Sequence, residues 1–309
     1  MAGTHFPWEN QVDRKTVISH DGVRISYQSI GTGTEKVVAL AHGLGGRLYT
    51  WAPLIEALMP EYRIIAWHYR GLFASETPKT IRRLAIPNHA EDLKQILDKE
   101  GIEKASVCGW SMGVQVALEF AVLYPERLDK MVLINGTYGH ALATGFQPVM
   151  RIPGMTMGLQ HGIDFLRRHP KLTRSAGRLP ATPLVAGLLG QAYGALRRNP
   201  QIKQAIKQYT QDVLGESVNN YLRLFQELDA HSTIHNLPEI NHPALVIWGD
   251  LDFLTPAYLS RRMKRRLKNA QSAHYRLGTH FVLLEYPKKV SGRIKKFLDS
   301  TVIPVDVFR

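Results

Sequence analysis

Short apolar runs alternate with amphipathic segments along most of this chain, and the alternation constrains the fold more than any other feature. The strand-like runs are residues 36–41, 62–67, 106–110, 131–134, 244–248 and 273–277. The helical patterns between and after them are residues 50–59, 88–99, 112–123, 256–267 and 287–298. Apolar runs bounded by glycine suit strands buried on both faces. Their alternation with helices predicts a parallel sheet with helices on both faces and right-handed crossovers.

A β-hairpin is expected near the start of the chain. Residues 16–27 carry β-branched and aromatic side chains on either side of Asp21-Gly22. An Asp-Gly pair between two such runs favours a tight hairpin turn. The sheet therefore gains an antiparallel pair at its beginning.

The alternation stops between residues 138 and 235. This segment is rich in Gly, Pro, Arg and Met, and it contains no convincing strand. Its helical stretches are residues 163–168, 183–196, 200–214 and 218–228. We therefore predict a core domain formed by residues 1–137 and 236–309, with residues 138–235 inserted as a helical unit.

Composition allows a large folded core and gives a weak indication of compartment. The chain has 309 residues, 44% of them hydrophobic, and its single cysteine is Cys108. One cysteine excludes an internal disulfide and fits a reducing compartment. Residues 1–9 lack the basic and apolar segments of a signal peptide. A cytoplasmic location is therefore expected.

The formal net charge is +13, and much of the positive charge lies in residues 261–268 and in the central segment. Solvated helix faces explain such clusters, since net charge speaks to solubility and nonspecific binding. No helix-turn-helix, zinc-finger or RNA-recognition motif is present, so no nucleic-acid partner is expected. Weak association with an anionic membrane surface stays open as an alternative.

The segment Gly109-Trp110-Ser111-Met112-Gly113 follows the pattern G-x-S-x-G. It lies between an apolar strand and an apolar helix, which is the context that this motif needs. The serine must sit on a tight, strained strand-to-helix turn, where side chains two residues away would collide with neighbouring elements. The following helix also directs the positive end of its dipole at the serine. We predict that Ser111 is a nucleophile.

With this motif in place, the chain resembles the α/β-hydrolase superfamily over most of its length outside the insertion. The resemblance implies a mostly parallel eight-stranded sheet flanked by helices, with residues 138–235 as a helical cap. His42-Gly43-Leu44-Gly45-Gly46 resembles the superfamily's oxyanion loop, which implies that the N–H groups of Leu44 and Met112 hold the oxyanion. The loop does not match either phosphate-binding motif.

One segment departs from the superfamily pattern. Residues 67–75 resemble D-x-R-G-x-G-x-S, but His68 stands in place of the acid and Phe73-Ala74 fills the region of the second glycine. These departures leave the nucleophile, acid and base positions untouched. They argue against a close match to a well-studied member.

The acid is predicted at Asp252. A serine nucleophile needs a base, and the base needs a carboxylate partner. Within Gly249-Asp250-Leu251-Asp252 the family pattern G-x-x-D selects Asp252, and its rival Asp250 suits a turn-shaping role. Some relatives carry the acid after the sixth strand, where this chain has Asn135, and an amide cannot supply the negative charge.

The base is predicted at His280. Among 13 histidines, it follows the acid in a glycine-flanked loop between the last strand and the last helix. His274 lies earlier, within the strand, and suits a buried or edge position. Cys108 is a second candidate nucleophile, although a small buried residue is the usual explanation for a strand cysteine.

These residues predict a serine hydrolase that cleaves a carboxylic ester through an acyl-enzyme intermediate, with no cofactor and no metal. The expected partner is a small-molecule ester or acyl substrate. An apolar acyl group is one alternative, with residues 152–157 and 183–190 as candidates for lining an acyl-chain tunnel. An acyltransferase or thioesterase with the same triad, a low-turnover ligand-binding protein and a membrane-surface lipid hydrolase stay open. Haloalkane dehalogenase and epoxide hydrolase are disfavoured, because relatives with that chemistry have an aspartate where Ser111 stands.

Overall fold

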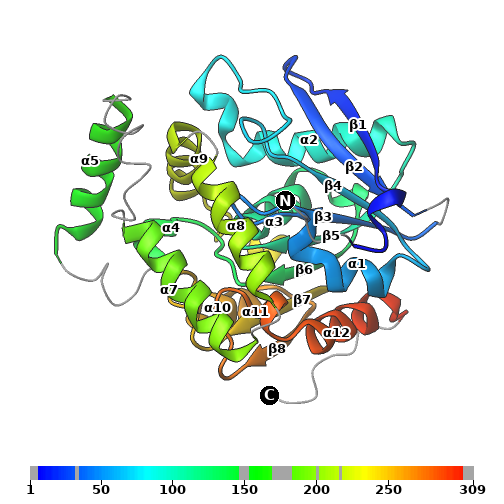
Figure 1. Cartoon of the computed structure of the whole chain (residues 1–309). Helices are drawn as coiled ribbons and strands as arrows, with labels where there is room; N and C mark the ends of the chain where they lie inside the picture. Colours follow the sequence, from blue (N-terminus) through cyan, green and yellow to red (C-terminus); the bar gives the residue numbers. More distant parts are fainter. Residues whose placement is uncertain are drawn as a thin grey trace.

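The computed structural model describes residues 6–31, 35–145, 153–168, 183–199, 202–215 and 218–301. Eight strands form one sheet in the order β1-β2-β4-β3-β5-β6-β7-β8 (Figure 1). They are β1 (Asp13–Ile18), β2 (Arg24–Ile30), β3 (Val37–Ala41), β4 (Arg63–Trp67), β5 (Ala105–Trp110), β6 (Leu128–Ile134), β7 (Ala244–Gly249) and β8 (Ala270–Tyr275). The pairs β1–β2 and β2–β4 are antiparallel, and the other neighbours run parallel. The mostly parallel eight-stranded sheet is confirmed.

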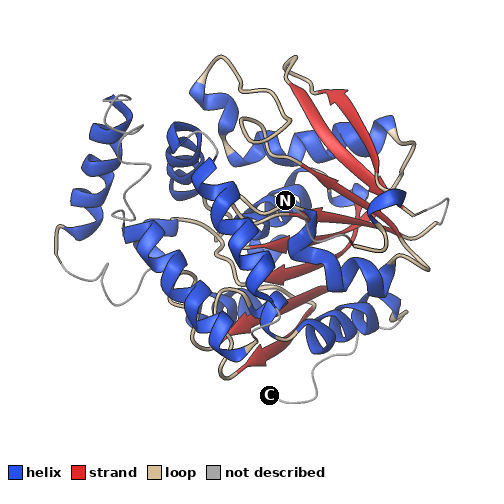
Figure 2. Cartoon of the chain, viewed as in Figure 1, coloured by secondary structure: helices blue, strands red, loops and turns tan. Residues whose placement is uncertain are grey.

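Helices cover both faces of this sheet (Figure 2). They are α1 (Ala52–Leu58), α2 (Ile86–Lys99), α3 (Met112–Leu123), α4 (Ala141–Thr144), α5 (Met155–Arg168), α7 (Pro183–Arg198), α8 (Lys203–Gly215), α9 (Val218–Ala230), α10 (Ala257–Arg266), α11 (Val282–Glu285) and α12 (Pro287–Asp299). The short 3-10 helices are η1 (Glu9–Gln11), η2 (Leu48–Trp51), η3 (Ile81–Leu84), η4 (Pro125–Arg127) and η7 (Leu237–Glu239).

The two faces bury separate hydrophobic cores. One core joins the sheet to α2, α3 and α10, and the other joins it to α1, α11 and α12. Strand β3 supplies both: Val38 and Leu40 pack in one core, while Ala39 and Ala41 pack in the other. Because successive strand residues point to opposite faces, a strand covered on both sides must be apolar throughout. This explains the continuous apolar runs in the sequence.

The solvent face of α10 carries the positive cluster of residues 261–268. Leu259 and Met263 are buried against β7, while Arg261 and Arg265 are exposed. The cluster therefore lies on the solvated side of an amphipathic helix, as the sequence predicts.

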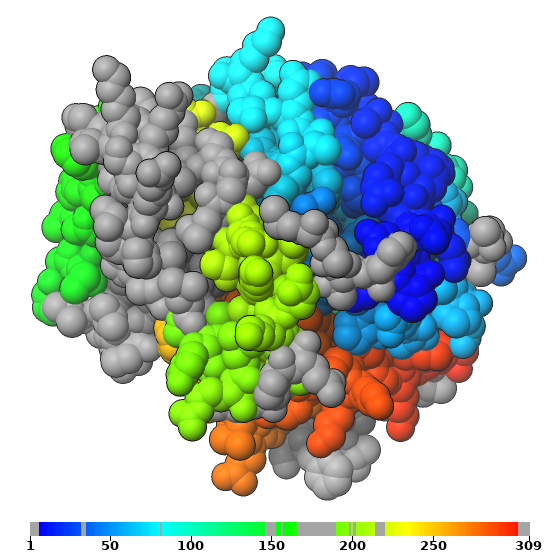
Figure 3. Space-filling view, viewed as in Figure 1, coloured from blue at the N-terminus to red at the C-terminus, as the bar shows by residue number. Residues whose placement is uncertain are grey.

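Five helices, α4, α5, α7, α8 and α9, lie between β6 and β7 in the described part of the chain. The segment enters and leaves at one place, since Gly139 and Ser232 form a β-bridge and Thr233 N–H donates to Tyr138 C=O at 2.8 Å. Helix α7 packs on α11, α8 on η2 and α9 on η3. Figure 3 shows residues of α7 and α8 over the middle of one face of the molecule. The division into a core and an inserted unit at residues 138–235 stays a prediction.

Most elements lie within three residues of their expected ends, and α5 and β8 differ in instructive ways. Helix α5 begins at Met155, before the expected residue 163, although Gly158 and Gly162 lower its helix propensity. Strand β8 ends at Tyr275 rather than residue 277, because Gly278 N–H bonds to Tyr275 C=O at 2.8 Å and closes a turn. No described helix has both the length and the apolar character needed to cross a bilayer.

Burial keeps three histidines, His42, His68 and His89, in the neutral form near pH 7. Burial lowers the pKa of His42 and His89 from 6.5 to about 3, and that of His68 to about 4. The positive charge of Arg70 adds to the effect at His89. The unfolded chain binds protons at these sites below pH 6.5, and the folded chain does not until pH 3–4. The contribution of these three histidines to stability is therefore full above pH 6.5 and is lost as the pH drops from 6.5 toward 3–4.

We expect His89→Gln to weaken this acid sensitivity. The His89 Nε2–H donates to Leu84 C=O at 3.0 Å, and a glutamine amide keeps a donor there. The wild type should lose about 1.4 kcal/mol more free energy of unfolding per pH unit than the variant between about pH 6 and 4.5. Urea unfolding at several pH values measures both slopes. Equal slopes would contradict the assignment of His89 as a buried neutral histidine.

Candidate active site

Ser111 occupies the turn between β5 and α3. Its backbone has φ 56° and ψ −113°, a left-handed conformation that costs a side-chain-bearing residue free energy. The Ser111 N–H bonds to Ile134 C=O in β6 at 2.9 Å, which fixes the turn to the neighbouring strand. Surrounding structure thus holds the hydroxyl in a strained position at the carboxyl end of the sheet.

Three glycines permit this turn because neighbouring atoms leave no room for a side chain. A Cβ at Gly113 would lie 2.0 Å from Ala41 O, and one at Gly109 would lie 2.2 Å from Gly113 O. A Cβ at Gly136, after β6, would lie 2.3 Å from Val114 Cγ2. The two motif glycines are therefore required by packing against β3 and within the turn.

The structure brings the predicted serine, histidine and aspartate together. His280 Nε2 lies 2.9 Å from Ser111 Oγ, and His280 Nδ1 lies 2.9 Å from Asp252 Oδ2. A carboxylate only accepts, so Nδ1 carries the proton and donates it. The Nε2 lone pair then faces the Ser111 hydroxyl, which is the tautomer that a general base needs.

The Asp252 carboxylate is buried and fully hydrogen-bonded. Oδ1 accepts from the N–H groups of Leu254 and Thr255, each at 2.9 Å. Oδ2 accepts from His280, from the Thr255 hydroxyl at 2.7 Å and from the Asn135 amide at 2.6 Å. A buried carboxylate is tolerated only with such partners. They also fix the direction in which the carboxylate faces the imidazole.

Asn135 is a site residue that sequence reasoning excluded. It directly follows β6, where some relatives carry the acid, and it is fully buried. Its Nδ2 donates to Asp252 Oδ2, so the amide stabilises the acid contributed by another loop instead of replacing it. The sequence did contain one signal for this role, which is the position of Asn135. A polar residue at the end of a buried strand faces the same edge of the sheet as Ser111.

The glycine loop after β3 lies against the serine. A Cβ at Gly43 would lie 3.2 Å from Ser111 Cβ. The loop is held by Trp51 Nε1–H donating to His42 Nδ1 at 2.9 Å and by the Tyr69 hydroxyl donating to His42 C=O at 2.7 Å. Neither Leu44 nor Met112 donates its N–H to another described residue. Both N–H groups are therefore free to donate to an anionic oxygen.

Both the fold and the geometry of the candidate site match one protein family. The model of the alpha/beta hydrolase fold family matches residues 36–287. This chain belongs to the alpha/beta hydrolase fold family. The matched range includes Ser111, Asp252 and His280 as well as the helices between β6 and β7.

Relatives within this family differ in their named activities. A poly(3-hydroxyalkanoate) depolymerase from Ectopseudomonas oleovorans is 30% identical over 259 residues, covering 84% of this chain and 83% of the relative. Epoxide hydrolase 4 from Mus musculus is 25% identical over 293 residues, covering 91% and 78%. The structure of an esterase from Exiguobacterium antarcticum matches with a TM-score of 0.73 and 20% identity, covering 93% of this chain and 99% of that one. The last similarity speaks to the fold alone.

The alternative candidates for the acid, the base and the nucleophile lie away from the hydrogen bond between His280 and the Ser111 hydroxyl. Asp250 accepts from Trp248 Nε1 at 3.0 Å and contacts His274 Nδ1 at 3.2 Å, and the His274 side chain is 55% exposed. Cys108 is buried, and burial raises the pKa of its thiol, so the reactive thiolate is disfavoured. Among the described residues, no cluster of three or more His, Cys, Asp or Glu side chains is placed to hold a metal ion.

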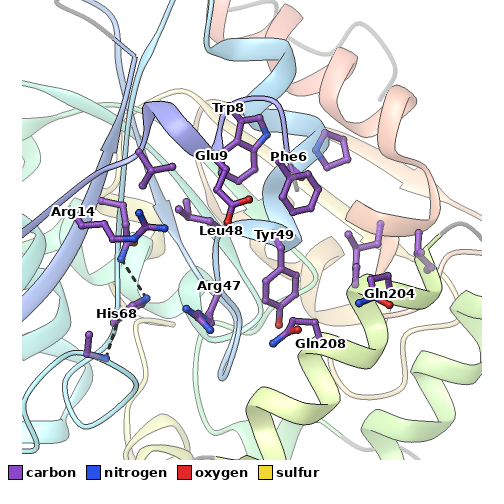
Figure 4. Close-up of a pocket in the computed structure, with 18 of the residues that line it drawn as sticks. Phe6, Trp8, Glu9, Arg14, Arg47, Leu48, Tyr49, His68, Gln204 and Gln208 are labelled. Atoms are coloured by element: carbon purple, nitrogen blue, oxygen red, sulfur yellow. Dashed lines mark hydrogen bonds between the residues drawn. The ribbon is translucent and has the colours of Figure 1, made fainter. Parts of the chain in front are cut away.

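A cavity of about 510 Å³ lies between the N-terminal segment, η2 and α8. Figure 4 shows Phe6 and Trp8 on one side, Arg47 and Tyr49 at the centre, and Gln208 from α8 opposite. No predicted site residue lines it, so it is distinct from the serine's surroundings. The Tyr49 hydroxyl donates to Asp212 at 3.0 Å, which links η2 to α8 beside this cavity.

The turn at Ser111 predicts a contrast between two glycine substitutions. Gly113→Ala should destabilise the protein by about 3 kcal/mol or more, because its Cβ would overlap Ala41 O. The matched control Gly292→Ala, in α12, meets nothing within 4 Å and should stabilise by about 0.5–1 kcal/mol. Urea unfolding measures both variants. A Gly113→Ala protein as stable as wild type would contradict the packing described here.

Proposed function

We propose that this chain is a serine hydrolase that cleaves a carboxylic ester through an acyl-enzyme intermediate. One observation carries the proposal: a buried imidazole lies 2.9 Å from the Ser111 hydroxyl on one side and 2.9 Å from the Asp252 carboxylate on the other. A histidine so oriented can remove the serine's proton and stabilise the positive charge that results.

The reaction follows from this arrangement in two steps. Ser111 attacks the ester carbonyl while His280 takes its proton, and the N–H groups of Leu44 and Met112 hold the oxyanion. His280 then protonates the leaving alcohol. In the second step His280 activates water, which attacks the acyl-serine and releases the acid. Preorganised donors of this kind each contribute about 3–4 kcal/mol of transition-state stabilisation in comparable sites.

The nucleophile favours acyl transfer over epoxide opening, although one relative is named an epoxide hydrolase. A serine that opened an epoxide would form an ether, which offers no carbonyl for water to attack. A serine that attacks an ester forms a new ester, which the same histidine can hydrolyse. The name depolymerase, carried by the relative that is 30% identical, supports the second chemistry.

We also propose that residues 138–235 act as a cap over the serine. The Tyr209 hydroxyl of α8 donates to Leu44 C=O at 2.9 Å, and Tyr221 of α9 lies against Gly45. Both contacts place inserted helices beside the oxyanion loop. A cover of this kind excludes water and shapes the substrate pocket. Residue 152 and the side chains of residues 156 and 183–189, named for an acyl-chain tunnel, lie outside the described residues.

A fluorophosphonate probe tests the catalytic proposal. The wild type should be labelled covalently, whereas Ser111→Ala should be silent and should lose ester hydrolysis by about 10⁴-fold or more. Cys108→Ala is the control, and it should be labelled like the wild type because its thiol is buried. Labelling that persists in Ser111→Ala would refute the assignment of the nucleophile. A silent wild type would favour a ligand-binding protein.

A series of p-nitrophenyl esters from acetyl to octanoyl tests whether the acyl pocket is apolar. We expect kcat/KM to rise with chain length, since each buried methylene contributes about 0.8 kcal/mol, or up to about fourfold. A flat or falling series would remove the long apolar acyl group from the proposal. Matched thioesters, and an added alcohol acceptor, separate the alternatives of thioesterase and acyltransferase.

A further inference from the structure

Gln191 of helix α7 has a buried side-chain amide that bridges two loops of the site. They are the acid loop after β7, which carries Asp252, and the base loop after β8, which carries His280. Only 2% of it is exposed, although Gly190 and Tyr193 beside it are exposed. Its Oε1 accepts from the His280 N–H at 2.7 Å, and its Nε2 donates to Leu251 C=O at 3.1 Å. Since the first partner only donates and the second only accepts, the amide has a single satisfactory orientation.

The bridge joins the residues that matter most in those loops. Leu251 immediately precedes Asp252, and the other bond reaches the main chain of His280 itself. The His280 carbonyl is held as well, because Trp110 Nε1–H donates to it at 3.0 Å. Trp110 thus holds the carbonyl of His280, and Gln191 holds its N–H.

Asn135 bridges the same two loops from the core. Its Nδ2 donates to Asp252 Oδ2 at 2.6 Å and to Thr279 C=O at 3.3 Å. Two side-chain amides thus connect the acid loop with the base loop: Asn135, directly after β6, and Gln191 in α7. The second connection belongs to the helical segment between β6 and β7, outside the sheet that carries the triad.

We propose that Gln191 is a positioning residue that makes the alignment of His280 with Asp252 and Ser111 depend on the seating of α7. The inference rests on the proposed serine-hydrolase function. Catalytic geometry must be held to within about 0.5 Å, and groups that lock it are needed as much as the reacting groups. Without the amide, the buried His280 N–H and the Leu251 C=O lose their partners. The Leu251 N–H bond to Gly278 C=O at 2.9 Å and the Asn135 bridge still join the loops, so the expected change is a shift of His280 rather than unfolding of the site.

The test compares three variants of the full chain. Gln191→Met keeps the length and helix propensity of the side chain but removes both hydrogen bonds. Gln204→Met, at an exposed position of α8, is the matched control for the same chemical change. Gln191→Glu, studied at about pH 8, keeps an acceptor for the His280 N–H but offers Leu251 C=O no donor.

Two readouts separate positioning from simple destabilisation. The first is kcat and KM for p-nitrophenyl acetate, with active sites counted by fluorophosphonate labelling. The second is the far-downfield proton NMR resonance of the His280–Asp252 hydrogen bond, which requires no turnover. We expect Gln191→Met to lower kcat about 10-fold or more with KM within twofold, corresponding to about 1.4 kcal/mol or more, and to weaken the resonance. Gln204→Met should match the wild type.

The outcomes are distinguishable. A Gln191→Met protein that melts earlier but keeps both kcat and the resonance would overturn the positioning role and leave the proposed function standing. If the resonance weakens while the wild type shows no esterase activity, the positioning role stands and the proposed function fails. Should Gln191→Met not fold, Gln191→Glu decides on the bridge, because it loses only the bond to Leu251 C=O, and a wild-type kcat and resonance in that variant would overturn the role of the link between the two loops.

Discussion

The close approach of backbone segments around Ser111 is the constraint on which the rest of the structure depends. Strand β5 turns directly into α3, and the first turn of that helix touches the end of β3 at Gly113. The same turn meets the segment after β6 at Gly136. These contacts set the spacing of the three central strands at their carboxyl ends. Every loop that supplies a site residue leaves the sheet at this edge, as open parallel sheets in general direct their ligand sites.

Around that turn, the polar groups of the site are held by partners rather than by solvent. The Asp252 carboxylate accepts bonds on both oxygens from fixed backbone and side-chain donors. Donors that are already oriented need no rearrangement as charge develops during a reaction, which is why they are effective in a buried site. The strain stored in the Ser111 backbone serves the same end, since it keeps the hydroxyl fixed relative to the imidazole.

The sequence was informative where local chemistry decides structure. Alternating periodicity predicted the sheet, and motif and chain order were enough to select Ser111, Asp252 and His280, which the structure brings together. Asn135 was judged only as a missing acid, because its role as a hydrogen-bond donor depends on which loop faces it across the sheet. Gln191 gave no signal at all. Its two bonds join residues 60 and 89 positions away, and such contacts exist only once the helices have packed.

The short ladder that closes residues 138–235 has an evolutionary consequence. Because Tyr138 and Thr233 are hydrogen-bonded neighbours, whatever lies between them can be exchanged or lengthened without altering a single strand pairing. With the cap function proposed above, such a graft point would let one scaffold acquire new substrate pockets by recombination. With the role proposed for Gln191, a transplanted segment that lacked an amide at that position would nevertheless lose turnover. Sequence changes in residues 138–235 would then be selected for their fit to the loop that carries His280, as well as for the substrates that they admit.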